Sequence, residues 1–333
     1  MGLRGPGARV LKKAPKPKPS TRKRQASWRR PGLSRSERVI RFVQSLKVTA
    51  GDGAGKRFRL RPWQKDIIRK VYDPVDEDGC RLVRTALLTM ARKNGKSGLV
   101  AALALAHLCG PEAESRGQVF SAAVDRSQAS ILYREMKAMA LASPELAARI
   151  IIRDFNKEIT DVETGSVYVA LSADAHNKHG FSTSFVAYDE LAQAPDRRLF
   201  DVLETSTGAR KEPLVWIIST QTSDPKHIMS ELTDYAKDVN AGVIEDPSFA
   251  GFVYEAPEGS DIWNEETWKL ANPALGDFRS IDEMRSYAAK AKRLPAREAV
   301  FRNLYLNQRI DASAAFISGT DWEACGGAST LMR

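Results

Sequence analysis

Cysteine and histidine are scarce in this chain of 333 residues, which has three cysteines and four histidines. Cys80, Cys109 and Cys325 lie far apart, and the sequence has neither a Cys-x-x-Cys pair nor the histidine spacing of a zinc site. These absences argue against a disulfide-stabilised secreted domain and against a structural zinc protein. We therefore expect a protein of the reducing cytosol.

Long hydrophobic runs are also lacking. The longest, residues 99–109, is interrupted by His107 and is far shorter than the roughly 18 residues that a membrane-spanning helix needs. The basic N-terminus is not followed by the apolar segment of a secretory signal, so we expect neither secretion nor a membrane contact. With 43% hydrophobic residues, the chain can still bury at least one globular core.

Acidic residues are missing from the first 30 positions, which carry 11 lysines and arginines. The formal net charge of +10 therefore belongs to this tail, and the rest of the chain carries −1. A stretch such as KKAPKPKPSTRKRQ cannot bury enough apolar surface to fold, so residues 1–32 are expected to form a disordered basic tail. Its charge suits a polyanion such as DNA, and a merely solubilising extension is the alternative.

Past the tail, short apolar stretches alternate with helical patterns. Apolar residues at helical spacing from Val39 to Leu46 predict a helix capped by Ser34 or Ser36, and Pro62 is favoured in the first turn of a second helix. Buried strands are predicted within residues 82–90, 117–124, 184–193 and 213–222, with helices within 95–110 and 126–143. This alternation predicts an α/β fold with a doubly wound, mostly parallel sheet.

The segment TMARKNGKSG, residues 89–98, ends like a phosphate-binding loop. That loop reads G-x-x-x-x-G-K-[ST], and Gly95, Lys96 and Ser97 fit it, whereas Met90 stands where the first glycine should be. Between a buried strand and a helix, the N–H groups of such a loop converge on a phosphate. We expect Lys96 to contact the β- and γ-phosphates of ATP and Ser97 to bind Mg²⁺, with Met90 avoiding a positive φ angle. An ordinary strand-turn-helix with a surface lysine is the alternative.

A second signal is the stretch SFVAYDELA, in which an apolar strand ends in two acids. Asp189 is placed to hold Mg²⁺ and Glu190 to orient the attacking water, which is the pair that ATP hydrolysis needs. A surface turn with two acids is the common alternative, but the acids and the loop support each other.

Five stretches, taken in order, resemble the large terminase subunit of tailed bacteriophages, in the group related to phage HK97. They are RPWQKDII (61–68), ARKNGKS (91–97), DEL (189–191), STQT (219–222) and ANPALGD (271–277). The resemblance runs from about residue 33 to the chain end. It implies a P-loop NTPase core of the RecA/ASCE type over residues 33–224 and a small helical lid subdomain over 225–312. Residues 313–333 would be a linker or the start of the family's nuclease domain, and we expect the rest of that domain to be missing from this sequence.

The same resemblance implies an ATP-driven motor that moves double-stranded viral DNA into a procapsid. Such a motor works in the host cytoplasm as a homo-oligomeric ring on the capsid portal, with a small terminase subunit as partner. Two rival hypotheses remain: a DNA or RNA helicase, which shares these motifs, and a degenerate remnant that binds DNA without hydrolysing ATP.

The resemblance also assigns roles to individual residues. Gln64 matches a glutamine that recognises adenine, and Arg92 matches an arginine that stabilises charge on the transferred phosphoryl group. Ser219 and Thr220 match a motif that couples hydrolysis to movement. The nucleotide contacts expected in the loop are Arg92, Lys93, Asn94, Gly95, Lys96 and Ser97, although Lys93 could simply be solvated.

One expected residue has no clear counterpart. Motors of this kind often use an arginine from the neighbouring subunit, borne just before the second acidic strand, and residues 173–185 contain no arginine. Lys178, Arg126 and Arg153 are the candidates that the sequence leaves open.

Overall fold

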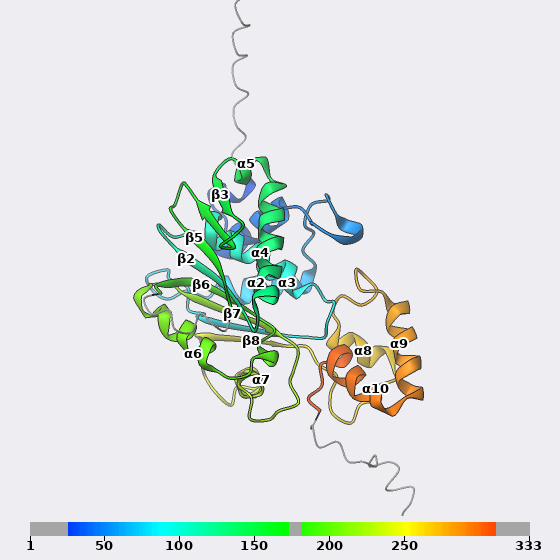
Figure 1. Ribbon diagram of the computed structural model, residues 1–333. Helices are drawn as coiled ribbons and strands as arrows, with labels where there is room; N and C mark the ends of the chain where they lie inside the picture. The colour runs from blue at the N-terminus through cyan, green and yellow to red at the C-terminus, as the bar shows by residue number, and fades with distance from the viewer. Residues whose placement is uncertain (1–25, 173–180, 311–333) are drawn as a thin grey trace, which may run out of the picture.

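A mixed eight-stranded sheet forms the centre of the molecule (Figure 1). This computed structural model describes residues 26–172 and 181–310, without the side chains of Asp52, Arg126, Ser172 and Pro295. The strands are β1 (Thr85–Thr89), β2 (Gln118–Ala123), β3 (Ile150–Arg153), β4 (Glu158–Asp161), β5 (Val167–Ser172), β6 (Thr183–Asp189), β7 (Leu214–Ser219) and β8 (Phe249–Val253).

The strand order is β3-β4-β5-β2-β6-β7-β1-β8. From β5 to β8 all neighbours are parallel, whereas β4 is antiparallel to both of its neighbours, β3 and β5. The predicted mostly parallel α/β sheet is confirmed. Because β7 lies between β1 and β6, the strand with the two acids is not adjacent to the strand that leads into the loop, although both end at the same edge of the sheet.

Ten α-helices are described, of which some cover the two faces of the sheet and others form a separate group at its side. They are α1 (Arg35–Ser45), α2 (Pro62–Tyr72), α3 (Lys96–Cys109), α4 (Arg126–Leu141), α5 (Pro144–Ala147), α6 (Arg198–Thr205), α7 (Ile228–Asn240), α8 (Glu265–Ala271), α9 (Ile281–Arg293) and α10 (Pro295–Val300). Their starts follow the local sequence: the Ser34 side chain accepts from the N–H of Glu37, and α2 begins at Pro62 as predicted. None of the described helices is long and apolar enough to cross a membrane.

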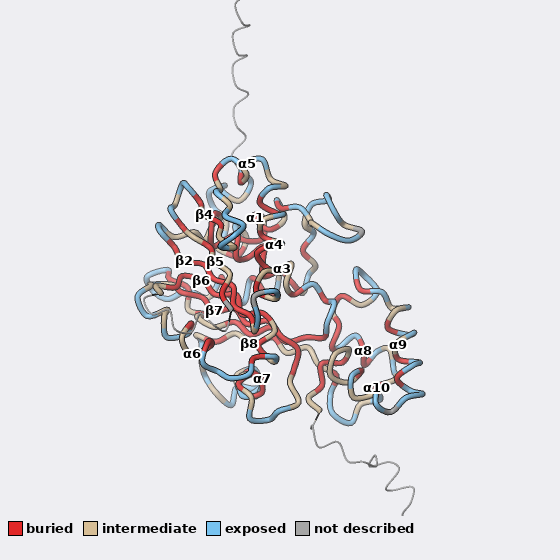
Figure 2. Tube along the Cα trace, viewed as in Figure 1, coloured by how far each residue is buried: buried red, intermediate tan, exposed pale blue. Residues whose placement is uncertain are grey.

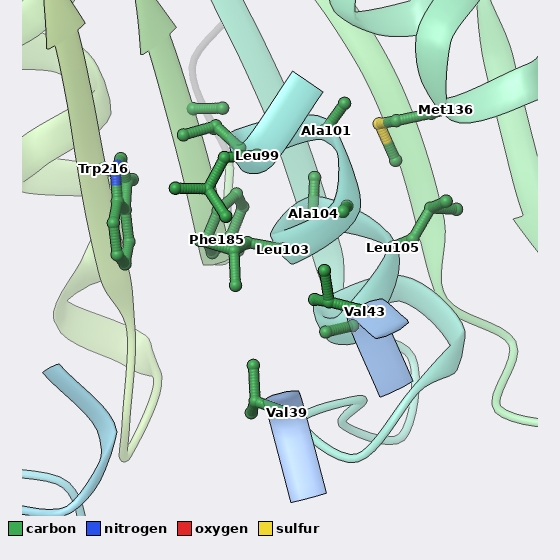
Figure 3. Close-up of a cluster of buried hydrophobic side chains, with 14 of the residues drawn as sticks. Val39, Val43, Leu99, Ala101, Leu103, Ala104, Leu105, Met136, Phe185 and Trp216 are labelled. Atoms are coloured by element: carbon green, nitrogen blue, oxygen red, sulfur yellow. The ribbon is translucent and has the colours of Figure 1, made fainter. Parts of the chain in front are cut away.

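Two hydrophobic cores enclose the sheet. On one face α1 to α4 pack against the strands; Figure 3 shows Val39 and Val43 of α1 and Leu103 of α3 gathered with Phe185 of β6 and Trp216 of β7. On the other face the core is completed by α6 and α7. Helix α3 is buried almost all round, because helices and strands surround it (Figure 2). This burial fixes the orientation of the helix that follows the candidate loop.

A separate core holds α8, α9 and α10 together at one side of the sheet (Figure 1). It consists of stacked aromatic rings around Phe301, with Trp268 and Met284 also buried. We call residues 256–308 the lid.

The lid is shorter than the range expected from the sequence, which began at residue 225. Helix α7 packs on the sheet, and β8 pairs with β1. Gly251 permits this close fit, since a Cβ atom there would lie 2.5 Å from the Cβ atom of Ala236. We therefore propose that the lid begins after Glu255.

Candidate functional site

The loop that follows β1 has an altered start and a standard end. Met90 is fully buried, donates its N–H to the carbonyl of Ser219 (3.3 Å) and does not have a positive φ angle. The left-handed residues are instead Lys93 (φ 66°) and Gly95 (φ 77°). A side chain is therefore tolerated at position 90, as the sequence analysis required, because the turn that needs left-handed backbone lies further along the loop.

Asn94 holds the loop together from within. Its buried side chain donates to the carbonyls of Ala91 (3.0 Å) and Arg92 (3.3 Å) and to the side-chain oxygen of Asn272 (2.8 Å). Its own oxygen accepts from the N–H of Ala274 (3.2 Å). Asn94 thus links the loop to the lid through hydrogen bonds. Its side chain is therefore not free to reach a ligand.

Lys96 is the first residue of α3, and its side chain turns back into the loop. The ammonium group donates to the carbonyls of Met90 (2.7 Å) and Ala91 (3.2 Å) and is 6% exposed. Burial lowers the pKa of Lys96 to about 8, although the charges of Asp189 and Glu190 act in the opposite direction. A partly desolvated cation at a helix N-terminus attracts anions strongly.

The two acids lie beside this lysine at the end of β6. Asp189 is 5% exposed, and one of its oxygens accepts from the hydroxyl of Ser97 (3.3 Å). Burial, with the neighbouring charge of Glu190, raises the pKa of Asp189 to about 6. The other Asp189 oxygen, Oδ1, and Glu190 Oε2 are buried without a hydrogen-bond partner among the described residues.

Glu190 has an uncommon backbone conformation. Its φ angle is 54°, in the left-handed region, and its N–H donates to the carbonyl of Ile218 in β7 (2.8 Å). A non-glycine residue pays a strain energy on the order of 1 kcal/mol there, so the neighbouring strand must hold it in place. Strain of this kind is concentrated at functional positions.

Ser219 connects the loop with the acids. It is fully buried at the end of β7, where its carbonyl accepts from Met90 and its hydroxyl accepts from the N–H of Ala192 (3.0 Å). Thr220 follows it and is 3% exposed. Ser219 therefore contacts both the loop and the segment that follows the acids.

Gln64, expected to read adenine, is 3% exposed and is therefore not a residue of the helix surface. Its side-chain oxygen accepts from the N–H of Arg61 (3.0 Å) and caps α2. Arg61 in turn pairs with Asp277 of the lid (2.5 Å) and stacks on Phe278, whose ring lies over Gly95. The cap, the loop and the lid therefore meet at one place.

The basic residues of the loop differ in their surroundings. The Arg92 side chain is exposed, and its charge contributes to the lowered pKa of Lys96. Lys93 is mostly exposed but forms an ion pair with Glu283 of α9 (3.0 Å), so it is not merely solvated.

The candidates for a residue acting on a neighbouring subunit stay untested. Lys178 lies outside the described residues, and the side chain of Arg126 is not described. Arg153 pairs with Glu158 on the hairpin of β3 and β4, at the opposite edge of the sheet from β1.

Sequence reasoning missed four polar residues that tie the lid to the site. Asn307 donates to the hydroxyl of Thr89 (3.0 Å) and to the carbonyl of Tyr254 (3.0 Å), and its oxygen accepts from the N–H of Gln221 (2.9 Å). Asn272 accepts from Asn94 and from Arg279. Gln221 and Asn272 lie within the quoted stretches STQT and ANPALGD without having been given a role. Nothing in the local sequence distinguished Asn307 or Arg279.

A strand, a glycine-lysine-serine loop, a buried helix and an acid pair on a non-adjacent parallel strand define a P-loop NTPase fold of the RecA/ASCE type. A family model described as "Terminase large subunit, ATPase domain" matches residues 62–238. The chain belongs to the terminase large subunit family and contains its ATPase domain.

Individual relatives agree with this assignment. The large terminase subunit of Enterobacteria phage HK97 is 40% identical over 298 residues, which are 88% of this chain and 57% of that protein. The crystal structure of the HK97 large terminase matches with a TM-score of 0.75 and 39% identity, over 88% of this chain and 59% of that one. This chain therefore spans less than two thirds of the length of these relatives.

The likeness extends to a more distant phage in fold alone. The ATPase domain of the large terminase from Thermus phage P74-26 has a TM-score of 0.51 at 19% identity, covering 74% of this chain and 98% of that one.

Proposed function

We propose that this chain hydrolyses ATP with Mg²⁺ and that the hydrolysis drives double-stranded DNA into a viral procapsid. The observation that carries the proposal is the cluster of buried Lys96 and Asp189 with half-buried Ser97 and Glu190, in which two buried carboxylate oxygens have no hydrogen-bond partner among the described residues. Such oxygens are costly to bury unless a ligand uses them.

ATP would bind with its phosphates over the N-terminus of α3. The N–H groups of Gly95, Lys96 and Ser97 suit the phosphate oxygens, and the ammonium of Lys96 would exchange loop carbonyls for the β- and γ-phosphates. Arg92 is exposed beside them and would stabilise charge on the transferred group. The ion pair of Lys93 and the hydrogen bonds of Asn94 support the alternative that these two residues shape the loop rather than contact the nucleotide.

Gln64 would contact the adenine through its amide nitrogen. Its oxygen is engaged in capping α2, whereas the nitrogen has no hydrogen-bond partner within the described part of the chain. As a donor only, Gln64 would recognise an acceptor nitrogen of the base.

The residues present fit a magnesium ion. Ser97 Oγ and Asp189 Oδ1 are hard oxygen ligands, and Asp189 Oδ1 lacks a hydrogen bond among the described residues. Mg²⁺ bound there would offset the charge of the phosphate oxygens. No group of three potential metal-binding side chains occurs among the described residues.

Glu190 would act as the base that orients the attacking water. One of its oxygens is buried without a hydrogen-bond partner among the described residues, its charge acts on both Lys96 and Asp189, and its backbone is left-handed. Ser219 would transmit a movement of the segment with the acids to the loop, because it is hydrogen-bonded to Met90 on one side and to Ala192 on the other. Thr220 is buried next to it and would belong to the same coupling segment.

Membership of the terminase family supports the wider assignment. We infer a homo-oligomeric ring on a capsid portal, a small terminase subunit as partner, and a place of action in the host cytoplasm. The basic residues of the tail would add affinity for DNA.

The test is steady-state ATP hydrolysis by the full chain at increasing protein concentration, with and without double-stranded DNA. Turnover per chain that rises with concentration or with DNA is expected, because a ring completes its sites on assembly. Strand separation coupled to hydrolysis would favour the helicase. Salt-dependent DNA binding without turnover under any condition would favour the remnant and contradict the proposal.

A further inference from the structure

Arg279 is a buried cation that lacks a counter-ion. It lies in the lid, directly after Phe278, and is 2% exposed. Its Nη1 donates to the carbonyl of Arg92 and to the side-chain oxygen of Asn272, and its guanidinium stacks on the ring of Tyr305 at 5.3 Å. The remaining nitrogens, Nε and Nη2, have no partner among the described residues, and no described carboxylate forms an ion pair with the group.

The charges near Arg279 do not neutralise the positive charge of its guanidinium group. Burial lowers the pKa of Arg279 to about 10, and Glu283 and Tyr305 only partly oppose this effect. Glu283 is already paired with Lys93 and accepts from Tyr305. The charge of Arg279 is also close enough to Lys96 to help lower the pKa of that lysine. A buried cation with unsatisfied hydrogen-bond donors, close to another cation, is unfavourable unless an anion comes near.

The backbone geometry connects this cation with the loop. Arg279 donates a hydrogen bond to the carbonyl of Arg92, and the N–H of Arg92 donates to the carbonyl of Leu304 (3.0 Å). Both backbone polar groups of Arg92 are therefore hydrogen-bonded to the lid. The N–H groups of such a loop bind the phosphates, whereas Arg279 contacts the loop through a carbonyl. Arg279 would therefore sense a polyphosphate through its field.

We propose that Arg279 is the positioning residue through which the lid responds to the negative charge of a nucleotide in the loop. A nucleotide supplies the charge that the buried guanidinium lacks, so nucleotide binding strengthens the docking of the lid. By thermodynamic reciprocity, a docked lid strengthens nucleotide binding by the same factor. The inference rests on the proposed binding of nucleotide in this loop.

The test compares ADP binding and ADP-induced thermal stabilisation of the full chain in wild type, R279Q, R279K and R81Q. Arg81 is the matched control: it is fully buried, its Nε has no hydrogen-bond partner among the described residues, and it precedes β1 at the other end of the strand. R279Q should weaken ADP binding on the order of fivefold or more and shrink the thermal shift, whereas R279K, which keeps the charge, should retain most of both. R81Q should lower the unfolding temperature without ADP but leave ADP affinity within about twofold of wild type.

Equal ADP affinity in R279Q and wild type would overturn the inference. Equal losses in R279Q and R279K would also overturn it, because they would indicate a hydrogen-bonding role instead of a charge effect. Absence of ADP binding by wild type would refute the proposed function itself, and this inference with it.

A measurement on the wild type covers the case in which R279Q does not fold. ADP should slow amide hydrogen exchange in α9 and in residues 301–305, which surround Arg279. Exchange in these segments that is unchanged by saturating ADP would contradict the inference.

Discussion

Lys96 is influenced by charges of both signs, since Asp189 and Glu190 favour its charged form while Arg92 and Arg279 oppose it. Its ammonium group is already desolvated, so little further desolvation is needed when it meets a phosphate. A preorganised charge of this kind provides much of the rate enhancement in phosphoryl transfer.

We predict that K96A lowers ATP turnover by on the order of 10² or more. The exposed Lys70 of α2 gives the matched control, and K70A should turn over ATP like wild type. The measurement is phosphate release at saturating ATP, with circular dichroism to verify folding. Activity of K96A comparable to that of K70A would refute the assignment of the loop.

A second prediction concerns Ser219, whose hydroxyl satisfies the N–H of Ala192. S219A should lower the free energy of unfolding by about 1 kcal/mol, since a buried donor loses its partner. It should also reduce the stimulation of ATPase activity by DNA while leaving ADP affinity unchanged. T205A is the control, because that hydroxyl bonds only within its own helix turn. Full DNA stimulation in S219A would argue against a coupling role.

At the scale of single residues, the sequence identified the candidate chemical groups but not the residues that hold them in place. Gly95, Lys96 and Ser97 form a compact motif, and Asp189 and Glu190 follow a clear apolar strand. Asn307 and Arg279 reach the site from far along the chain, and a single asparagine or arginine has no local pattern that marks it. Such contacts depend on tertiary packing, which one sequence does not reveal.

Among the elements, strands were predicted well where they are central and poorly where they lie at the edges. β1, β6 and β7 are continuous apolar runs, as a parallel sheet covered on both faces requires. β3 and β4 have only four residues each with alternating burial, which is too few for the alternation to stand out. β8 contains a glycine, which is unfavourable in strands.

The edge hairpin offers a prediction about stability and pH. Arg149 donates two hydrogen bonds of 2.6 Å to Asp161, which is fully buried at the end of β4. Burial opposes ionisation of Asp161, but the hydrogen bonds from Arg149 and Thr164 outweigh it and lower the pKa of this carboxyl. D161N should therefore cost about 3 kcal/mol of unfolding free energy at neutral pH, because Arg149 loses its buried partner.

The sign of the pH effect follows from the lowered pKa. The stability contributed by Asp161 is complete above the ordinary pKa of 3.8 and is lost as the pH falls through the lower folded value. Urea unfolding from neutral pH to about pH 3 should show a steeper loss in wild type than in D161N. E158Q, which affects the exposed pair on the same hairpin, should change stability by less than about 1 kcal/mol. Parallel pH profiles for wild type and D161N would contradict this account.

At the scale of the whole molecule, the lid and the sheet are held together around the loop. Arg61 pairs with Asp277, Lys93 pairs with Glu283, and Asn94 bonds Asn272. The sequence predicted a helical lid beginning at residue 225, whereas α7 packs on the sheet. The local pattern of α7 is that of a helix whichever core it joins. The position of that boundary depends on which surface buries the helix, and this surface is formed by strands that are distant in sequence.

The central claim is that Glu190 promotes cleavage of an ATP molecule held by Lys96 and Asp189, without being needed to bind it. The most direct test mixes a small excess of radiolabelled ATP with wild type and with E190Q in the presence of Mg²⁺ and identifies the nucleotide that each protein retains. The account predicts that wild type retains ADP and that E190Q retains intact ATP with similar affinity. Retention of ADP by E190Q would contradict it, since the bond would then have been cleaved without the proposed base.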